Sequence, residues 1–163
     1  MNTTLFTENH ELEYKLNSKI DEKKFLSLKN KLDKKCWEKT DELMIYDEIY
    51  ENNTRKSLIN NNEIIYITKT RLYNKIIQIN NKHDLKCSVS LEKPLENIFS
   101  GNIKCIRSKH RFSYFSTNWK FDLSIINNEN FEVELEFFNL HYMRNNFIHD
   151  LHSIAVNEFT KIL

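Results

Sequence analysis

The stretch that decides the fold is Phe131-Glu132-Val133-Glu134-Leu135-Glu136-Phe137, in which acidic and apolar residues alternate. Side chains along a β-strand point alternately to its two faces, so the carboxylates share one face and the apolar side chains share the other. The segment Glu11-Leu12-Glu13-Tyr14-Lys15-Leu16 repeats this pattern near the N-terminus. Like charges on one face repel, so such a face is stable when it is solvated or meets a cation. Clustered carboxylates are also preferred ligands of Mg²⁺ and Mn²⁺.

Two segments before the last acidic stretch alternate in the same way with a different charge. One face of the segment from Ile106 to Phe112 carries Arg107, Lys109 and Arg111, and one face of the segment from Trp119 to Ile125 carries Lys120, Asp122 and Ser124. A single acidic strand is most simply the polar outer face of an amphipathic antiparallel strand. Because the charges here are sorted by strand, we expect the charged faces to point into a barrel and to surround a polyanion.

Composition limits the class of protein. The chain has 163 residues and a formal net charge of +1, so we expect one domain spanning residues 1–163 and no general attraction to nucleic acid or membrane. No apolar run is long enough to span a bilayer, and the first residues do not have the pattern of a signal peptide. We therefore expect an intracellular protein of the nucleus or cytoplasm, neither secreted nor bound to membranes.

The predicted elements are mostly strands with two helices. The helices run from the capping residue Asp21 to Lys35 and from Met143 to Lys161. The strands are Glu11–Leu16, Leu43–Tyr50, Thr54–Leu58, Glu63–Arg71, Lys75–Ile79, Leu85–Glu92, Ile103–Tyr114, Lys120–Ile126 and Phe131–Phe138. Since closure removes exposed sheet edges, the fold class that we predict is α+β: a closed antiparallel β-barrel of about eight strands, with a helix after strand 1 and a C-terminal helix.

The order and spacing of these charged strands resemble those of the triphosphate tunnel metalloenzymes. The likeness is greatest to the fungal and viral metal-dependent mRNA 5′-triphosphatases of cap synthesis. The E-x-E-x-K first strand of that branch matches Glu11, Glu13 and Lys15, and its E-x-E-x-E last strand matches Glu132, Glu134 and Glu136. Its R-x-K-x-R strand matches Arg107, Lys109 and Arg111, and the strand that follows matches Lys120, Asp122 and Ser124.

The resemblance implies an eight-stranded tunnel that binds Mn²⁺ or Mg²⁺ and a triphosphate. The implied metal-binding residues are Glu11, Glu13, Glu134 and Glu136. Glu134 and Glu92 would also help to place the attacking water. The implied phosphate-binding residues are Arg55, Lys69, Arg107, Lys109, Arg111, Lys120 and Lys15. Asp122 would orient a basic neighbour, and Glu132 and Ser124 would support the site.

Some assignments stay open at this level. Arg71 has the same parity as Lys69, Glu92 is also a candidate for a solvated turn residue beside Pro94, and Lys15 either binds phosphate or pairs with a glutamate. A homodimer is also left open, because the outer aromatic residues fit either the helices or a second subunit.

The implied activity is removal of the γ-phosphate from triphosphate-ended RNA, the first step of mRNA capping, with nucleoside triphosphates as small substrates. The product would pass to an mRNA guanylyltransferase. The alternatives are an inorganic or thiamine triphosphatase of the same superfamily and a non-catalytic barrel that binds polyphosphate or RNA. The three glutamates of the last strand argue against the first, and the two complete acidic strands argue against the second.

Overall fold

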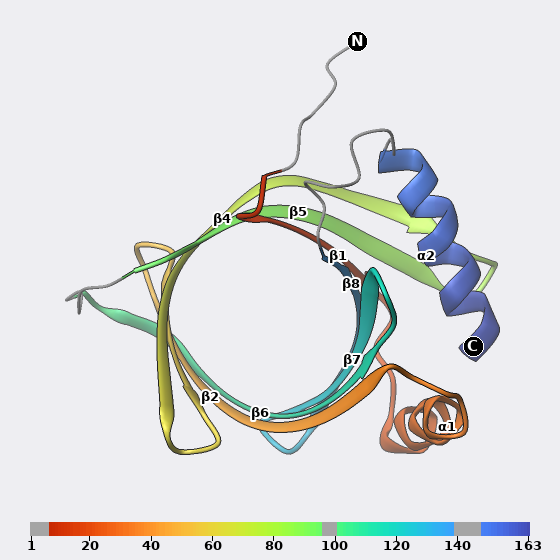
Figure 1. The fold of residues 1–163 in the computed structure, drawn as a ribbon, viewed down its shortest axis with the longest axis horizontal. Helices are drawn as coiled ribbons and strands as arrows, with labels where there is room; N and C mark the ends of the chain where they lie inside the picture. The colour runs from red at the N-terminus through yellow and green to blue at the C-terminus, as the bar shows by residue number, and fades with distance from the viewer. Residues whose placement is uncertain (1–6, 96–100, 139–147) are drawn as a thin grey trace, which may run out of the picture.

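The computed structural model describes residues 7–95, 101–138 and 148–163, and these form a closed barrel flanked by helices (Figure 1). The elements are β1 His10–Leu16, α1 Glu22–Asp33, β2 Lys39–Tyr50, β3 Thr54–Ile59, β4 Glu63–Gln78, β5 Asp84–Pro94, β6 Ile103–Phe115, β7 Trp119–Ile126, β8 Asn130–Phe137 and α2 Ile148–Ile162. The strands close in the order β1-β5-β4-β3-β2-β6-β7-β8, and every neighbouring pair is antiparallel. The predicted fold class is confirmed, while the predicted helix start at Met143 lies outside the described residues.

Two predicted strand bounds are wrong: β2 begins at Lys39 and not at Leu43, and β4 continues where a break was predicted. We predicted separate strands at Glu63–Arg71 and Lys75–Ile79, with a break near Asn74, but β4 is one strand of 16 residues. A register shift between Arg71 and Tyr73 absorbs one extra residue, and Asn74 stays paired with Ser88 of β5. A β-bulge of this kind changes the alternation without ending the ladder, so the pattern on the two sides of it differs in phase.

Asparagines make several of the turns, as expected for a chain with one glycine and one proline. Asn53, Asn60, Asn61, Asn127 and Asn128 all have a positive φ, between 51° and 64°. Asparagine tolerates this left-handed backbone because its short polar side chain can bond locally. These turns join β2 to β3, β3 to β4 and β7 to β8.

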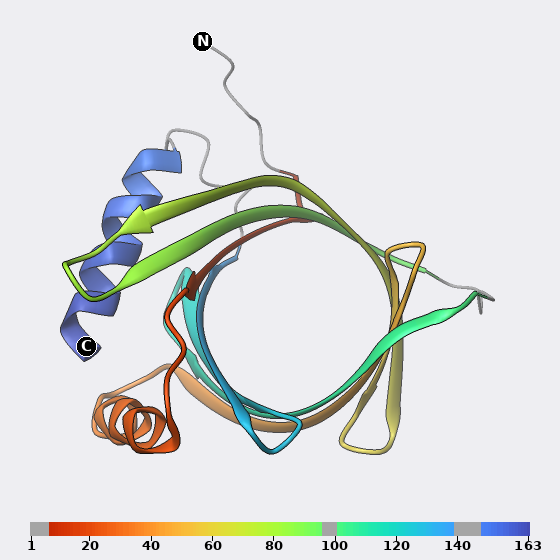
Figure 2. The same cartoon turned by 180° about the vertical axis from the view of Figure 1, so that it is seen from behind.

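The hydrophobic core lies outside the barrel, between its wall and the two helices. Helix α1 begins after Asp21, whose carboxylate accepts a hydrogen bond of 2.8 Å from the Lys24 amide, and it buries Phe25, Leu28 and Leu32. The outer apolar faces of β1, β5, β7 and β8 complete this core with residues of α2. The helices lie on the same side of the barrel in both views (Figures 1 and 2).

The outer face on the opposite side of the barrel has a different character. Met44, Tyr46 and Ile64 on β2 and β4 are exposed there, and no helix within the described ranges covers them. The two helices therefore cover only part of the apolar outer surface. Because the charged faces point inward, the apolar faces of the remaining strands are left exposed. No helix of the described residues is long and apolar enough to cross a membrane.

Candidate active site

The charged faces of the strands point into the barrel, as predicted, and enclose a cavity of about 720 Å³. Side chains from all eight strands line it. Of the predicted site residues, those that line it are Glu11, Glu13, Lys15, Arg55, Lys69, Glu92, Arg107, Lys109, Arg111, Lys120, Asp122, Glu134 and Glu136. The supporting residues Glu132 and Ser124 lie on the same faces of β8 and β7 and contact lining residues.

Carboxylates gather on one wall, where β1 and β8 run side by side. Glu13 is in register with Glu136 across this pair, and Lys15 is in register with Glu134. Burial raises the pKa of Glu13 well above its ordinary value, and the charges of Glu134 and other neighbouring glutamates raise it further. Burial also raises the pKa of Glu136 to about 7, against the opposing effect of Lys120. This wall therefore repels additional negative charge and favours a cation.

Lysines are the counter-ions of these carboxylates in the structure. Lys69 Nζ lies 2.8 Å from a carboxylate oxygen of Glu11 and 4.0 Å from one of Glu92. Burial raises the pKa of Glu11, but the charge of Lys69 and hydrogen bonds outweigh it and lower this pKa to about 2. Burial, a hydrogen bond with Glu11 and the charge of Glu11 raise the pKa of Glu92 to about 7. On β7, the strand next to β8, Lys120 Nζ lies 3.3 Å from a carboxylate oxygen of Glu136.

Asp122 of β7 links two of the basic residues. Its side chain is 2% exposed, and its carboxylate lies 3.1 Å from Lys120 Nζ and 3.8 Å from the guanidinium of Arg111. It also accepts a hydrogen bond of 2.5 Å from Ser113. Arg111 Nε donates to Ser124 Oγ at 3.2 Å, which fixes the orientation of the guanidinium. A planar group held in this way can offer its remaining donors to an anion in one direction.

Arg55 on β3 contributes an unsatisfied donor to the same cavity. Its Nε is buried and has no hydrogen-bond partner within residues 7–95, 101–138 and 148–163. A buried donor without a partner costs free energy, so native proteins normally satisfy it with protein, water or ligand. An anion in the cavity would be one such partner.

The structure answers the three questions that the sequence left open about geometry. Lys69 and Arg71 both line the cavity, and Lys69 is the one that contacts Glu11. Glu92 lies within β5 and faces the cavity, so it is not a turn residue. Lys15 pairs with glutamates: its ammonium contacts Glu132 directly and lies 3.9 Å from Glu134.

Sequence reasoning missed Asp47 of β2. This aspartate is 2% exposed, lies 3.4 Å from Lys109 Nζ and accepts a hydrogen bond of 2.5 Å from Ser57. Burial and the charge of Arg111 lower the pKa of Lys109, while Asp47 opposes the shift. The residues two positions before and after it, Ile45 and Ile49, are apolar. The strand therefore lacks the alternation of charged residues that indicated an inward polar face in other strands.

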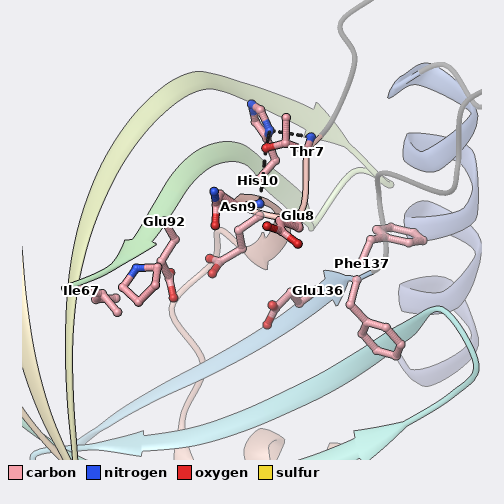
Figure 3. Close-up of a pocket in the computed structure, with 11 residues that line it drawn as sticks. Thr7, Glu8, Asn9, His10, Ile67, Glu92, Glu136 and Phe137 are labelled. Carbon is pink, nitrogen blue, oxygen red and sulfur yellow. Dashed lines mark hydrogen bonds between the residues drawn. The ribbon is translucent and has the colours of Figure 1, made fainter. Parts of the chain in front are cut away.

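A second cavity of about 460 Å³ adjoins the acidic end of the barrel (Figure 3). It shares Glu11, Ile67, Glu92 and Glu136 with the main cavity and adds Glu8 from the segment before β1. Figure 3 shows the side chains of Glu8, Glu92 and Glu136 around this space. The acidic end of the barrel is thus accessible to small polar molecules.

The donor set suits a hard divalent cation in its chemistry. Carboxylate oxygens are the ligands that Mg²⁺ and Mn²⁺ prefer, and several converge on one wall. Within the described ranges, no group of three His, Cys, Asp or Glu side chains is arranged to hold a metal ion. The carboxylates instead contact Lys69 and Lys120, so binding a metal requires some of these side chains to reorient.

Comparisons with known proteins place this geometry in context. The RNA triphosphatase Pct1 of Schizosaccharomyces pombe is 21% identical with a TM-score of 0.71, over 86% of this chain and 75% of that chain. The RNA triphosphatase domain of the mimivirus capping enzyme is 19% identical with a TM-score of 0.70, over 98% of this chain and 91% of that chain. The chain therefore shares the fold of these proteins. The predicted resemblance is confirmed at the level of the fold.

A shared fold does not by itself give the activity. A structure of the S. pombe Mediator head module matches with a TM-score of 0.60 at 9% identity, over 94% of this chain and 92% of that chain. No family model matches the sequence, and no curated protein sequence matches it. The function has to be argued from the residues that line the tunnel.

Proposed function

We propose that this protein is an RNA 5′-triphosphatase, which hydrolyses the γ-phosphate of triphosphate-ended RNA and leaves a 5′-diphosphate. The observation that carries the proposal is the tunnel itself, which has a wall of buried glutamates facing cations and a buried Arg55 Nε that no group in the described part of the chain satisfies. A linear polyanion would accept the hydrogen bond of Arg55 and contact the cations of the tunnel. A divalent cation bound with it would neutralise the wall of glutamates. The likeness to proteins described as RNA triphosphatases supports the same activity.

The phosphate oxygens would be bound by Arg55, Lys69, Arg107, Lys109, Arg111 and Lys120, all of which line the cavity. Their role is to neutralise the negative charge that moves onto the leaving oxygen and the terminal phosphate during transfer. Asp122 would position Lys120 and Arg111 for this task, because it lies within ion-pair distance of both. Lys15 would act mainly by keeping Glu132 and Glu134 in place.

Glu11, Glu13, Glu134 and Glu136 would hold Mn²⁺ or Mg²⁺. The bound ion would act as a Lewis acid on the phosphate oxygens and neutralise part of their charge. Glu92 and Glu134 would accept hydrogen bonds from the attacking water and orient it toward the terminal phosphorus. Hydrolysis by an oriented water needs no nucleophilic side chain.

The product of this reaction defines the kind of enzyme that follows it. An RNA with a 5′-diphosphate is the acceptor for guanylyl transfer in cap synthesis, so an mRNA guanylyltransferase is the expected next enzyme. One of the similar structures is described as Pct1 in complex with the Spt5 CTD, at 19% identity and a TM-score of 0.67. A protein partner of that kind for this chain would have to be sought by direct binding measurements.

The test compares three substrates under defined metal conditions. Purified protein is incubated with γ-labelled triphosphate RNA, inorganic triphosphate and ATP, each with Mg²⁺, with Mn²⁺ and with a chelator. We expect release of labelled phosphate from RNA that requires a metal, and a specificity constant for RNA at least equal to that for inorganic triphosphate. A clear preference for inorganic triphosphate would favour the other catalytic branch, and no turnover of any substrate would favour a binding barrel.

A further inference from the structure

The cations of the tunnel differ in whether a carboxylate neutralises them. At the end of the barrel where β7 begins, Lys120 contacts both Asp122 and Glu136. Arg111, on the neighbouring strand β6, also lies within 3.8 Å of Asp122. Lys69 on β4 contacts Glu11. The cations near the glutamates are therefore largely compensated.

Five other cations that line the tunnel have no such partner among the described residues, and Arg55 is one of them. For the other four, Arg71, Lys86, Lys104 and Arg107, no carboxylate in the described part of the chain lies within the 4.0 Å limit of an ion pair. Uncompensated positive charge inside a cavity attracts an anion more strongly than paired charge does, since the pair is already neutral.

Strand register shows that these four residues lie toward one end. In β6, Phe115 pairs with Lys120, which in turn pairs with Glu136, so the C-terminal end of β6 is the acidic end. Arg107 and Lys104 lie nearer the N-terminal end of the same strand, away from Glu136.

The strands β4 and β5 show the same gradient. Lys69 is in register with Glu92, and Arg71 follows as the next inward position away from it. At the far end of β5, Lys86 is directly in register with Lys15 of β1. Like charges directly opposite in a sheet are destabilising, and Lys15 is drawn toward Glu132 instead. Lys86 therefore has no ion-pair partner among the residues that the structure describes.

We propose that the RNA chain leaves the tunnel through this basic end and that Lys86, Arg71 and Lys104 bind the α-phosphate and the first phosphodiesters. This inference rests on the proposed function and adds the orientation of the substrate and the residues that select RNA over a short triphosphate. The γ-phosphate then lies toward Glu136 and Glu92.

The orientation agrees with what the chemistry requires. In phosphoryl transfer, the attacking water and the leaving oxygen lie roughly in line on opposite sides of the phosphorus. With the RNA leaving through the basic end, water must approach from the acidic end. The second cavity lies there and is lined by Glu92 and Glu136 (Figure 3). The same cavity gives the released phosphate a route out that the RNA does not block.

The experiment measures specificity constants for triphosphate RNA and for inorganic triphosphate in the variants Lys86→Ala and Arg71→Ala. We expect each to lower the ratio of the RNA constant to the inorganic one by about tenfold, because a charge-assisted hydrogen bond is worth roughly 1.5 kcal/mol or more. Lys75→Ala is the matched control. Lys75 of β4 is in register with the buried Cys87 of β5, so both side chains lie on the outer face of the sheet, away from the tunnel. It should leave the ratio as in the unaltered protein.

A second measurement tests whether the contacts are to phosphates. The slope of log Kd for single-stranded triphosphate RNA against log salt should fall by about 0.7 for each phosphate contact removed. Equal losses on both substrates would overturn the proposal, because the two residues would then bind the triphosphate itself. An unchanged ratio would also overturn it, while leaving the proposed function intact. If the unaltered protein fails to hydrolyse triphosphate RNA, the proposed function itself is wrong.

Discussion

Lys69 on β4 donates a hydrogen bond of 2.8 Å to Glu11 on β1, across the intervening strand β5. The contact places a positive charge among glutamates whose burial, and to a lesser extent mutual repulsion, raises the pKa of several members of the group. A lysine in this position reduces the cost of burying the carboxylates while no metal is bound. The same contact helps to keep Glu11 ionised: burial raises the pKa of this carboxyl, but the charge of Lys69 together with hydrogen bonds to Lys69, Glu92 and Glu13 lowers it to about 2.

The first prediction concerns the glutamate wall. Substitution by alanine of Glu11, Glu13, Glu134 or Glu136 should lower the rate of triphosphate hydrolysis by roughly 100-fold or more, if the loss equals that of one preorganised transition-state stabiliser. The variants should remain folded, since removing one of several repelling carboxylates relieves repulsion. Steady-state kinetics and circular dichroism measure the two effects.

Glu42→Ala is the control for these variants. Glu42 lies on the exposed outer face of β2, where it contacts His110 at 2.6 Å. This substitution should change turnover little. Near-normal turnover in all four wall variants would mean that these carboxylates have no part in the reaction.

The second prediction concerns stability without metal. Burial raises the folded-state pKa values of Glu92 and Glu136 to about 7, from an ordinary value of 4.5 in the unfolded chain. Between these values the folded protein holds more protons than the unfolded chain does, so the free energy of unfolding should fall as pH rises from about 4.5 to above 7. Thermal unfolding in a chelator should therefore give a lower Tm at pH 8 than at pH 5.5.

Added Mn²⁺ should change this trend, because a metal binds ionised carboxylates and its binding releases protons. The gain in Tm on adding Mn²⁺ should be larger at pH 8 than at pH 5.5. Glu136→Gln, which cannot ionise at this position, should flatten the pH dependence in the chelator. A Tm in the chelator that rises through this pH range would contradict the prediction.

The parts of the fold that could be predicted are those in which alternation is unbroken. In β1, β6, β7 and β8 the charged residues occupy every second position, so their inward direction followed from strand geometry alone. The match in order and spacing to a known family then supplied Arg55 and Glu92. Neither could be assigned from its own strand, because the residues on either side of Arg55 are polar and Glu92 is followed by Lys93 and Pro94.

The parts that could not be predicted depend on tertiary pairing. The bulge after Arg71 changes the phase of β4, and only its pairing with β5 shows that the strand continues. Asp47 joins the polar lining of the cavity because Lys109 and Ser57 contact it from the neighbouring strands, and these contacts cannot be read from the local sequence. The gradient of charge along the barrel also depends on register, which the sequence alone did not determine.

The third prediction tests the contribution of Asp47. Asp47→Asn removes the carboxylate that faces Lys109, whose side chain is 7% exposed. Removing one partner of a buried ion pair typically costs about 3–5 kcal/mol, because the remaining charge is buried without compensation. Urea denaturation at pH 7 should show a loss of this order. Asp41→Asn is the control: Asp41 pairs with Lys39 at 3.0 Å on the exposed part of β2, where the cost should be below about 1 kcal/mol.

The last prediction separates a tunnel that encloses the triphosphate from a surface that merely attracts RNA. Arg111 lies inside the barrel, where Ser124 and Asp122 orient its guanidinium. Arg111→Lys keeps the charge but loses the planar arrangement of donors, so it should recover only a small part of the activity lost in Arg111→Ala. Because contacts inside the tunnel are weakly screened, the defect should persist at high salt and should affect inorganic triphosphate as much as RNA. If lysine instead restores activity, or if the defect appears only with long RNA and fades as salt rises, Arg111 acts through its charge alone and does not hold the triphosphate.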